Sequence, residues 1–165
     1  METIITHSAS ETQELGEQFA RKILSNFARP RLGASILCLY GELGSGKTTF
    51  VQGLARGLGI KRRIISPTFV IVRQYVILTL NEVKGKDLDS SSTTQNDQKN
   101  FYHIDLYRCE TEKDIQAIGI KEILEDPENV IAIEWPEKLG TLLPDKRTDI
   151  MFQYLNEEER KIEIT

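Results

Sequence analysis

The sequence predicts an α/β fold, a three-layer sandwich of helices around a mixed central β-sheet. Short apolar runs of strand character alternate with helical patterns along the chain, which is the order expected when helices cover a sheet. Residues 41–48 read GELGSGKT, a glycine-rich segment between an apolar run at 35–40 and a helical pattern that begins near Lys47. The 165 residues are enough for one domain with a substantial core.

Apolar periodicity places the elements in order. The predicted strands occupy residues 2–6, 35–40, 69–78, 101–108, 130–133, 149–155 and 161–165. The predicted helices occupy residues 8–28, 47–58 and 111–125. Ser8 or Ser10 caps the first helix, and Pro30 ends it. Gly59 closes the second helix. The apolar face of the first helix consists of Leu15, Phe19, Ile23, Leu24 and Phe27.

The glycine-rich segment is a complete G-x-x-x-x-G-K-[ST] phosphate-binding loop. A strand that leads into such a loop and a helix N-terminus places unpaired N–H groups and the positive end of the helix dipole against phosphate. The glycines Gly41, Gly44 and Gly46 allow the backbone turns. Lys47 reaches the β- and γ-phosphates, and the Thr48 hydroxyl can ligate Mg²⁺. The fold is therefore expected to be P-loop NTPase-like, with a structural glycine turn as the alternative.

Composition narrows the partners and the compartment. The chain has 21 basic and 25 acidic side chains and a formal net charge of −4, so it is not a general nucleic-acid binder held by positive charge. Cys38 and Cys109 lie far apart and lack metal-ligand spacing. Without a signal-like segment, a long apolar span or a disulfide framework, we expect a protein of the reducing cytoplasm with no membrane contact.

Residues 81–100 break the alternating pattern. They read NEVKGKDLDSSSTTQNDQKN, a polar run that is nearly free of apolar anchors. Such a run cannot repay the entropy lost on ordering. We therefore expect a mobile insert or hairpin tip at 81–100 within a single domain of residues 1–165, since the sequence shows no repeat and no domain boundary.

Two carboxylates end apolar runs. A phosphate loop needs an acidic group to manage the metal and the attacking water. In VIAIEW, Glu134 follows four apolar residues, at the position where many P-loop proteins place an acidic residue near Mg²⁺. In FYHIDLYR, strand alternation places His103, Asp105 and Tyr107 on one polar face. A helix cap or surface carboxylate is the alternative for Asp105, and a lone strand histidine is more often a hydrogen-bonded structural residue than a proton-transfer group.

Two further segments are candidates for the same site. Ser66-Pro67-Thr68 opens a strand-like run after the phosphate-loop helix, where P-loop NTPases often bring a switch segment to the γ-phosphate. The same tripeptide also fits an ordinary turn. Trp135 follows Glu134 directly, and its indole could pack over the site, dock a partner or serve only as core packing.

Taken together, these segments resemble one known family. GELGSGKTTF, SPTF, HIDLYR and IEWPEKL occur in this order and at compatible spacing. Over nearly its whole length the chain is similar to the bacterial TsaE family (formerly YjeE), the P-loop ATPase of the tRNA threonylcarbamoyladenosine pathway. The departure is residues 81–100, which look longer than the usual hairpin of that family.

The resemblance implies roles for individual residues. Asp105 would position or activate the attacking water, so Asp105 and Glu134 form the implied catalytic pair. Thr48 and Glu134 would hold Mg²⁺ directly or through water. The residues implied for nucleotide binding are Gly41, Glu42, Leu43, Gly44, Ser45, Gly46, Lys47, Thr48, Thr49, Ser66, Thr68, Trp135, Thr12 and Arg160. Residues 8–12, with Thr12, and Arg160 mark the adenine pocket, which in this family lies between the N-terminal segment and the C-terminal strands.

The resemblance also implies a function. It implies a weak or partner-dependent ATPase that binds ATP/ADP and Mg²⁺ and works with a TsaB–TsaD pair. The complex would form threonylcarbamoyladenosine at position 37 of tRNAs reading ANN codons, with tRNA contacted indirectly through the partners. A nucleotide-dependent binding module without significant hydrolysis and a small-molecule kinase remain alternatives. A kinase usually needs an arginine-bearing lid, and residues 81–100 contain no arginine. No N-K-x-D guanine reader occurs, which favours adenine.

Overall fold

The computed structural model describes residues 1–27, 33–62, 64, 71–77 and 99–165. Within these ranges one mixed sheet of seven strands has the order β1-β7-β6-β2-β5-β4-β3. The strands are β1 (Glu2–Thr6), β2 (Ser35–Tyr40), β3 (Val72–Val76), β4 (Asn100–Asp105), β5 (Asn129–Glu134), β6 (Thr148–Tyr154) and β7 (Arg160–Ile164). The helices are α1 (Ala9–Asn26), α2 (Lys47–Gly57), α4 (Glu112–Gln116), α5 (Ile120–Glu125) and the 3₁₀ segment η2 (Pro136–Leu142). The α/β class with a mixed sheet is confirmed.

The centre of the sheet is parallel. Strand β2 pairs in parallel with β5 and β6, and β5 pairs in parallel with β4. The outer pairs β1–β7, β7–β6 and β3–β4 are antiparallel. The carboxyl ends of four parallel strands therefore meet at one edge of the sheet, which is where open α/β sheets bind their ligands.

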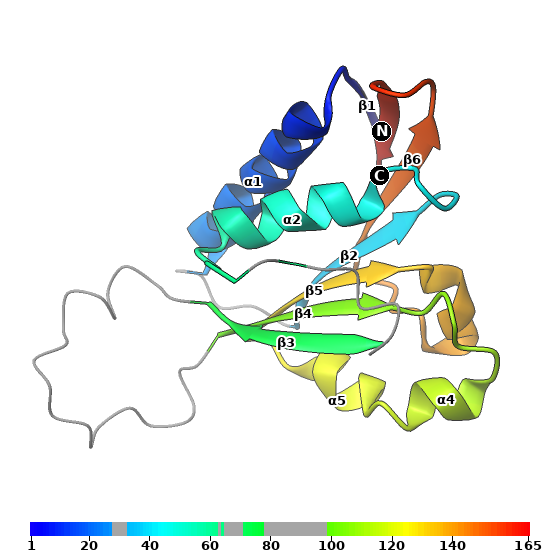
Figure 1. Cartoon of the computed structure of the whole chain (residues 1–165). Coiled ribbons are helices and arrows are strands. Elements are labelled where there is room, and N and C mark those ends of the chain that lie inside the picture. The colour runs from blue at the N-terminus through cyan, green and yellow to red at the C-terminus, as the bar shows by residue number, and fades with distance from the viewer. Residues whose placement is uncertain (28–32, 63, 65–70, 78–98) are drawn as a thin grey trace, which may run out of the picture.

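Helices lie on both faces of the sheet (Figure 1), and an apolar layer covers each face. Because alternate strand residues point to opposite faces, Leu37 and Leu39 pack with α1 and α2, whereas Cys38 packs in the layer of α4, α5 and η2. The predicted apolar face of α1 is confirmed, since all of its side chains join the first layer: Leu15, Phe19, Ile23, Leu24 and Phe27.

Helix α2, which follows the phosphate loop, packs unusually close to α1. A Cβ atom at Gly53 would lie 1.9 Å from the carbonyl oxygen of Gln13, and one at Gly16 would lie 2.3 Å from that of Phe50. Contacts this short leave room only for glycine. These glycines hold α2, and with it the end of the phosphate loop, against α1, a contact that the sequence analysis did not predict.

Several predicted boundaries changed. The helix expected at 111–125 is two short helices, because Gly119 between them adopts a left-handed backbone with a φ of 69°. The strand expected at 101–108 ends at Asp105, where the Tyr107 N–H turns back to the aspartate side chain, and it begins one residue earlier, at Asn100. Ser8 is the cap of α1, and Gly59 follows α2 with a φ of 81°.

Some predictions fall on parts of the chain that the structure does not describe. Residues 81–98 of the predicted insert and the Ser66-Pro67-Thr68 turn lie outside the described residues, as does Pro30. Among the helices that are described, none combines the length and the apolar character needed to cross a membrane.

Candidate functional site

A cavity of about 200 Å³ opens at the carboxyl edge of the parallel strands. Its lining comes from five segments of the chain. Residues 43–49 come from the phosphate loop and the start of α2, and Asp105, Tyr107, Glu134 and Trp135 come from the ends of β4 and β5. We call these residues, with Gly41 and Glu42, the phosphate end. The remaining lining residues are Ala9, Thr12, Glu157, Glu158 and Arg160.

The phosphate loop has the backbone that its glycines predict. Gly41 has a φ of 133°, and a Cβ atom there would lie 2.4 Å from the carbonyl oxygen of Phe152. Gly46, the N-cap of α2, has a φ of 104° and no side-chain cap. The first N–H groups of α2 have no intrahelical partner, and the positive end of its dipole faces the loop. The Ser45 hydroxyl is buried and has no hydrogen-bond partner among the described residues. These features together suit an anion.

Lys47 is the buried cation of the loop. It is 4% exposed, and its Nζ donates to the carbonyl oxygens of Gly41 at 2.6 Å and Glu42 at 2.9 Å. The same nitrogen lies 4.4 Å from the ring centroid of Trp135. Burial lowers the pKa of Lys47, and nearby carboxylates, Glu134 first among them, oppose this shift. The lysine is thus held at the mouth of the loop, where a phosphate would compete for its hydrogens.

Thr48 and Glu134 meet beside this lysine. The Thr48 hydroxyl donates to the Glu134 carboxylate, 2.9 Å from Oε1 and 3.2 Å from Oε2. The Oε1 atom is also 2.9 Å from Nε2 of His103, a fully buried side chain on β4. Glu134 itself is 3% exposed. The structure therefore joins the two predicted metal-binding residues, and it adds a histidine behind them.

Asp105 lies at the same edge of the sheet. It is paired in register with Glu134 of the adjacent strand, and it is 4% exposed. Its Oδ1 accepts the backbone N–H of Tyr107 at 3.0 Å, and its own N–H donates to the carbonyl of Ile71 at 2.9 Å. The alternative of a surface carboxylate is wrong for this residue.

An aromatic wall closes one side of the phosphate end. Trp135 has a left-handed backbone with a φ of 61°, a conformation that non-glycine residues rarely adopt. Its ring centroid lies 5.2 Å from that of Tyr107. The Nζ of Lys138 donates to the carbonyl oxygens of Tyr107 and Cys109 and so fixes the loop that carries the tyrosine. Trp135 is thus a pocket residue in contact with Lys47.

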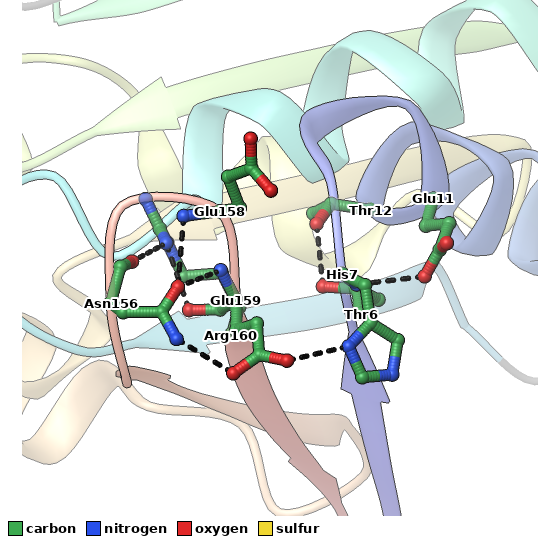
Figure 2. A network of polar contacts seen from close by, with 8 residues as sticks. All are labelled: Thr6, His7, Glu11, Thr12, Asn156, Glu158, Glu159 and Arg160. Atoms are coloured by element: carbon green, nitrogen blue, oxygen red, sulfur yellow. Dashed lines mark hydrogen bonds and ion pairs between the residues drawn. The ribbon is translucent and has the colours of Figure 1, made fainter.

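The β6–β7 turn also borders the pocket. Arg160 packs beside Gly46, with its Cγ 3.6 Å from the position of a Cβ atom there. Its Nη1 donates to the carbonyl oxygens of Asn156 at 2.6 Å and Glu159 at 2.8 Å, as Figure 2 shows. The Arg160 Nε is buried and has no hydrogen-bond partner among the described residues. The guanidinium is therefore locked to the turn while it lines the pocket.

A polar network ties this turn to the start of α1 (Figure 2). The Asn156 side chain accepts the N–H groups of Glu158 and Glu159, and its amide donates to the Glu159 carboxylate at 2.7 Å. The other oxygen of that carboxylate is 2.7 Å from Nδ1 of His7. The hydrogen bonds from His7, which has the largest effect, and from Asn156 hold the pKa of Glu159 below its ordinary range. We call the turn at 156–160, together with His7 and the Thr12 end of α1, the hairpin rim.

The residues present fit a nucleotide phosphate with Mg²⁺. Unpaired helix N–H groups, Lys47 and the unpartnered Ser45 hydroxyl are donors, while Thr48 and Glu134 supply hard oxygens. In the described part of the chain, no three His, Cys, Asp or Glu side chains gather into a metal cluster. A Mg²⁺ site needs few protein ligands, because the ion is usually bound by one or two carboxylates together with substrate phosphates and water.

The structure places most of the predicted site residues around one cavity. The predicted residues in its lining are Thr12, Leu43, Gly44, Ser45, Gly46, Lys47, Thr48, Thr49, Asp105, Glu134, Trp135 and Arg160. The carbonyl oxygens of Gly41 and Glu42 accept hydrogen bonds from Lys47, and Ser66 and Thr68 lie outside the described residues. Ala9, within the predicted segment at residues 8–12, also lines the cavity, whereas the lining residues Glu157 and Glu158 were not predicted. The acidic turn between two predicted C-terminal strands was the available signal for the two glutamates.

Comparisons with known proteins agree on one family. The family model described as "Threonylcarbamoyl adenosine biosynthesis protein TsaE" matches residues 6–162. The chain is 33% identical over 144 residues to the tRNA threonylcarbamoyladenosine biosynthesis protein TsaE of Bacillus subtilis, covering 87% of this chain and 75% of that protein. It is 30% identical over 168 residues to the protein of the same name from Aquifex aeolicus, covering 99% and 96%.

A solved structure is similar as well. The crystal structure of YdiB from Bacillus subtilis superposes with a TM-score of 0.65 at 27% sequence identity. The match covers 98% of this chain and 82% of that one.

Proposed function

The chain belongs to the TsaE family, and we propose that it is an ATP-binding, Mg²⁺-dependent ATPase subunit of tRNA threonylcarbamoyladenosine biosynthesis. The pathway would form threonylcarbamoyladenosine at position 37 of tRNAs reading ANN codons, and the chain would act in it together with TsaB and TsaD partners in the cytoplasm. The observation that carries the proposal is the contact of Thr48 with Glu134 beside the buried Lys47 at the phosphate loop.

Each group at the phosphate end has a distinct task in this proposal. The loop N–H groups and Lys47 bind and orient the β- and γ-phosphates. Thr48 and Glu134 would hold Mg²⁺, which would offset the negative charge of the phosphates. Asp105, at the edge of the same cavity, positions the attacking water and accepts its proton. Trp135 and Tyr107 exclude water from that side of the pocket.

A partner is needed because the pocket supplies few positive charges. Of the described lining residues, only Lys47 and Arg160 are cationic, and Arg160 is bonded to the β6–β7 turn. A phosphoryl-transfer site with an incomplete set of charge-stabilising groups hydrolyses slowly until another chain completes it. We propose that a TsaB–TsaD-like pair does so. The formal charge of −4 agrees with tRNA being bound mainly by those partners.

The test is ATP hydrolysis by the purified chain, alone and with a TsaB–TsaD pair, in Mg²⁺ and in EDTA. We expect slow turnover alone, a rise of about 10-fold or more with the pair, and none in EDTA. The chain with Lys47→Ala is the control for contaminating ATPases. Tight ATP binding without hydrolysis in any mixture would instead support a nucleotide-dependent binding module.

A further inference from the structure

The hydrogen bond between His103 and Glu134 has no part in the mechanism above. His103 is 0% exposed on β4, between β3 and β5 in the sheet. It does not line the cavity, so it is not placed to touch a nucleotide. Burying a polar ring costs free energy unless the ring is hydrogen-bonded. Its contact is the Glu134 carboxylate, with Nε2 2.9 Å from Oε1.

The surroundings of the ring indicate which nitrogen carries hydrogen. A carboxylate oxygen only accepts hydrogen bonds, so Nε2 is the donor. The Nδ1 atom is buried and has no hydrogen-bond partner among the described residues. A hydrogen at Nδ1 would be a buried donor without an acceptor, which is unfavourable. Both observations point to Nε2 as the ring nitrogen that carries hydrogen toward Glu134.

This donor fixes one oxygen of Glu134 from the side of the core. Oε1 receives both the His103 ring and the Thr48 hydroxyl, at 2.9 Å each. Oε2 has the longer Thr48 contact, at 3.2 Å. A carboxylate held at one oxygen from behind cannot rotate freely about its terminal bonds. The second oxygen and the threonine hydroxyl therefore keep one orientation at the pocket wall.

We propose that His103 is a positioning residue that holds Glu134 in the orientation in which Glu134 and Thr48 together receive Mg²⁺. This inference rests on the proposed function, because it assumes that Mg²⁺ enters with the nucleotide. Groups that orient a metal ligand typically change metal affinity by about 10- to 100-fold when they are removed. The effect should therefore be confined to binding that depends on Mg²⁺.

Two amide substitutions at this position separate positioning from packing. In His103→Gln, the amide nitrogen is as many bonds from Cβ as Nε2 is in histidine, so it can reach Glu134. In His103→Asn, the amide nitrogen corresponds to Nδ1 and stops short of that carboxylate. Both variants bury one neutral amide, so they are matched in polarity. They differ in whether the amide N–H can reach the Glu134 carboxylate.

The measurement is ADP affinity by calorimetry, in Mg²⁺ and in EDTA. We expect His103→Gln to keep the gain in affinity from Mg²⁺ to within about 3-fold, and His103→Asn to lose about 10-fold or more of it. Affinity in EDTA should match the wild type for both. An unchanged gain in His103→Asn would overturn the proposal. An equal loss with and without Mg²⁺ would also overturn it, because it would show general damage to the pocket.

A spectrum of the wild-type chain tests the contact without a change at this position. The sequence contains two histidines, His7 and His103, so ¹⁵N-histidine labelling gives two ring systems, and His7→Gln assigns them. We expect hydrogen on Nε2 of His103, and a ring that carries hydrogen on Nδ1 while Nε2 is bare would contradict the proposal. A wild type that binds no ADP or ATP would sink the proposed ATPase and this inference together, although the spectrum would still report the hydrogen bond to Glu134.

Discussion

The phosphate end and the hairpin rim bound the same cavity with polar contacts of opposite character. At the phosphate end, Lys47 and Glu134 are 4% and 3% exposed, and His103, which contacts Glu134 from the core, is 0% exposed. At the rim, the side chains of His7 and Glu159 are 61% and 36% exposed and pair in contact with solvent. Hydrogen bonds are short at both ends: Lys47 Nζ lies 2.6 Å from the Gly41 carbonyl oxygen, and His7 Nδ1 lies 2.7 Å from Oε1 of Glu159.

Burial, and not distance, sets the energetic weight of the two ends. Exposed ion pairs contribute about 0–1 kcal/mol, because water screens the charges and the side chains lose entropy. Removing one partner of a buried pair costs about 3–5 kcal/mol, because the other is left desolvated and unpaired. Substitutions at the phosphate end should therefore abolish steps of the nucleotide cycle, whereas substitutions at the rim should adjust affinity.

The largest effect is expected for Lys47→Ala. It removes the buried cation, and we expect the binding free energy of ATP, measured by calorimetry, to weaken by about 2–5 kcal/mol, together with loss of hydrolysis. The matched control is Lys61→Ala, which removes one positive charge from an exposed loop position. ATP affinity equal to that of the control would break the assignment of Lys47 as the phosphate clamp.

Asp105→Asn should separate hydrolysis from binding at the same end. Asparagine keeps an oxygen for the Tyr107 N–H but removes the carboxylate that positions and deprotonates water. We expect ATP affinity within about 3-fold of wild type and hydrolysis with TsaB–TsaD lower by about 10²- to 10⁴-fold. Asp145→Asn, at an exposed position, is the control. Intact hydrolysis in Asp105→Asn would transfer the role to another group, with Glu134 first in line.

The phosphate end was largely predictable from sequence. The motif fixed the loop, since Gly41, Gly46 and Lys47 are the residue types that its backbone and charge require. Asp105 and Glu134 follow apolar runs that became adjacent parallel strands, so their carboxylates had to meet at one edge. A short motif and strand periodicity are local signals, and local signals can be recognised in the sequence without knowledge of the tertiary structure.

The remaining features depend on contacts between distant segments. Nothing in FYHIDLYR shows that His103 would donate to Glu134, because the sequence does not report which side chain of β4 faces which of β5. The close approach of Gly16 and Gly53 likewise depends on how two helices cross. His7 and Glu159 are 152 residues apart, and no pattern links them. Such pairs become visible only when the fold brings them together.

Arg160→Met sharpens the comparison at the rim. The substitution keeps an unbranched side chain beside Gly46 but removes the guanidinium from the carbonyls of Asn156 and Glu159. We expect ATP affinity to fall by about 0.5–1.5 kcal/mol, roughly 2- to 10-fold, with hydrolysis per bound nucleotide unchanged. Lys161→Met, the neighbouring cation on β7 that pairs with Glu163, is the control. A loss as large as that of Lys47→Ala would show that the rim is no weaker than the phosphate end.

The smallest effect is expected from Glu159→Gln, and it should depend on pH. Hydrogen bonds from His7 and Asn156 hold the pKa of Glu159 below its ordinary value of 4.5, so the folded state favours the ionised form. A carboxylate with a depressed folded pKa contributes stability that is present above its unfolded pKa and is lost as the pH falls through its folded pKa. The melting temperature of wild type should therefore exceed that of Glu159→Gln slightly at pH 6, and the two should converge as the pH falls through the depressed folded pKa of Glu159. Glu158→Gln, next to it in the same turn, is the control. A difference between wild type and Glu159→Gln that persists unchanged in acid would mean that the His7–Glu159 contact stabilises the fold through packing and not through charge. The rim and the buried phosphate end could then not be compared as exposed and buried charge pairs.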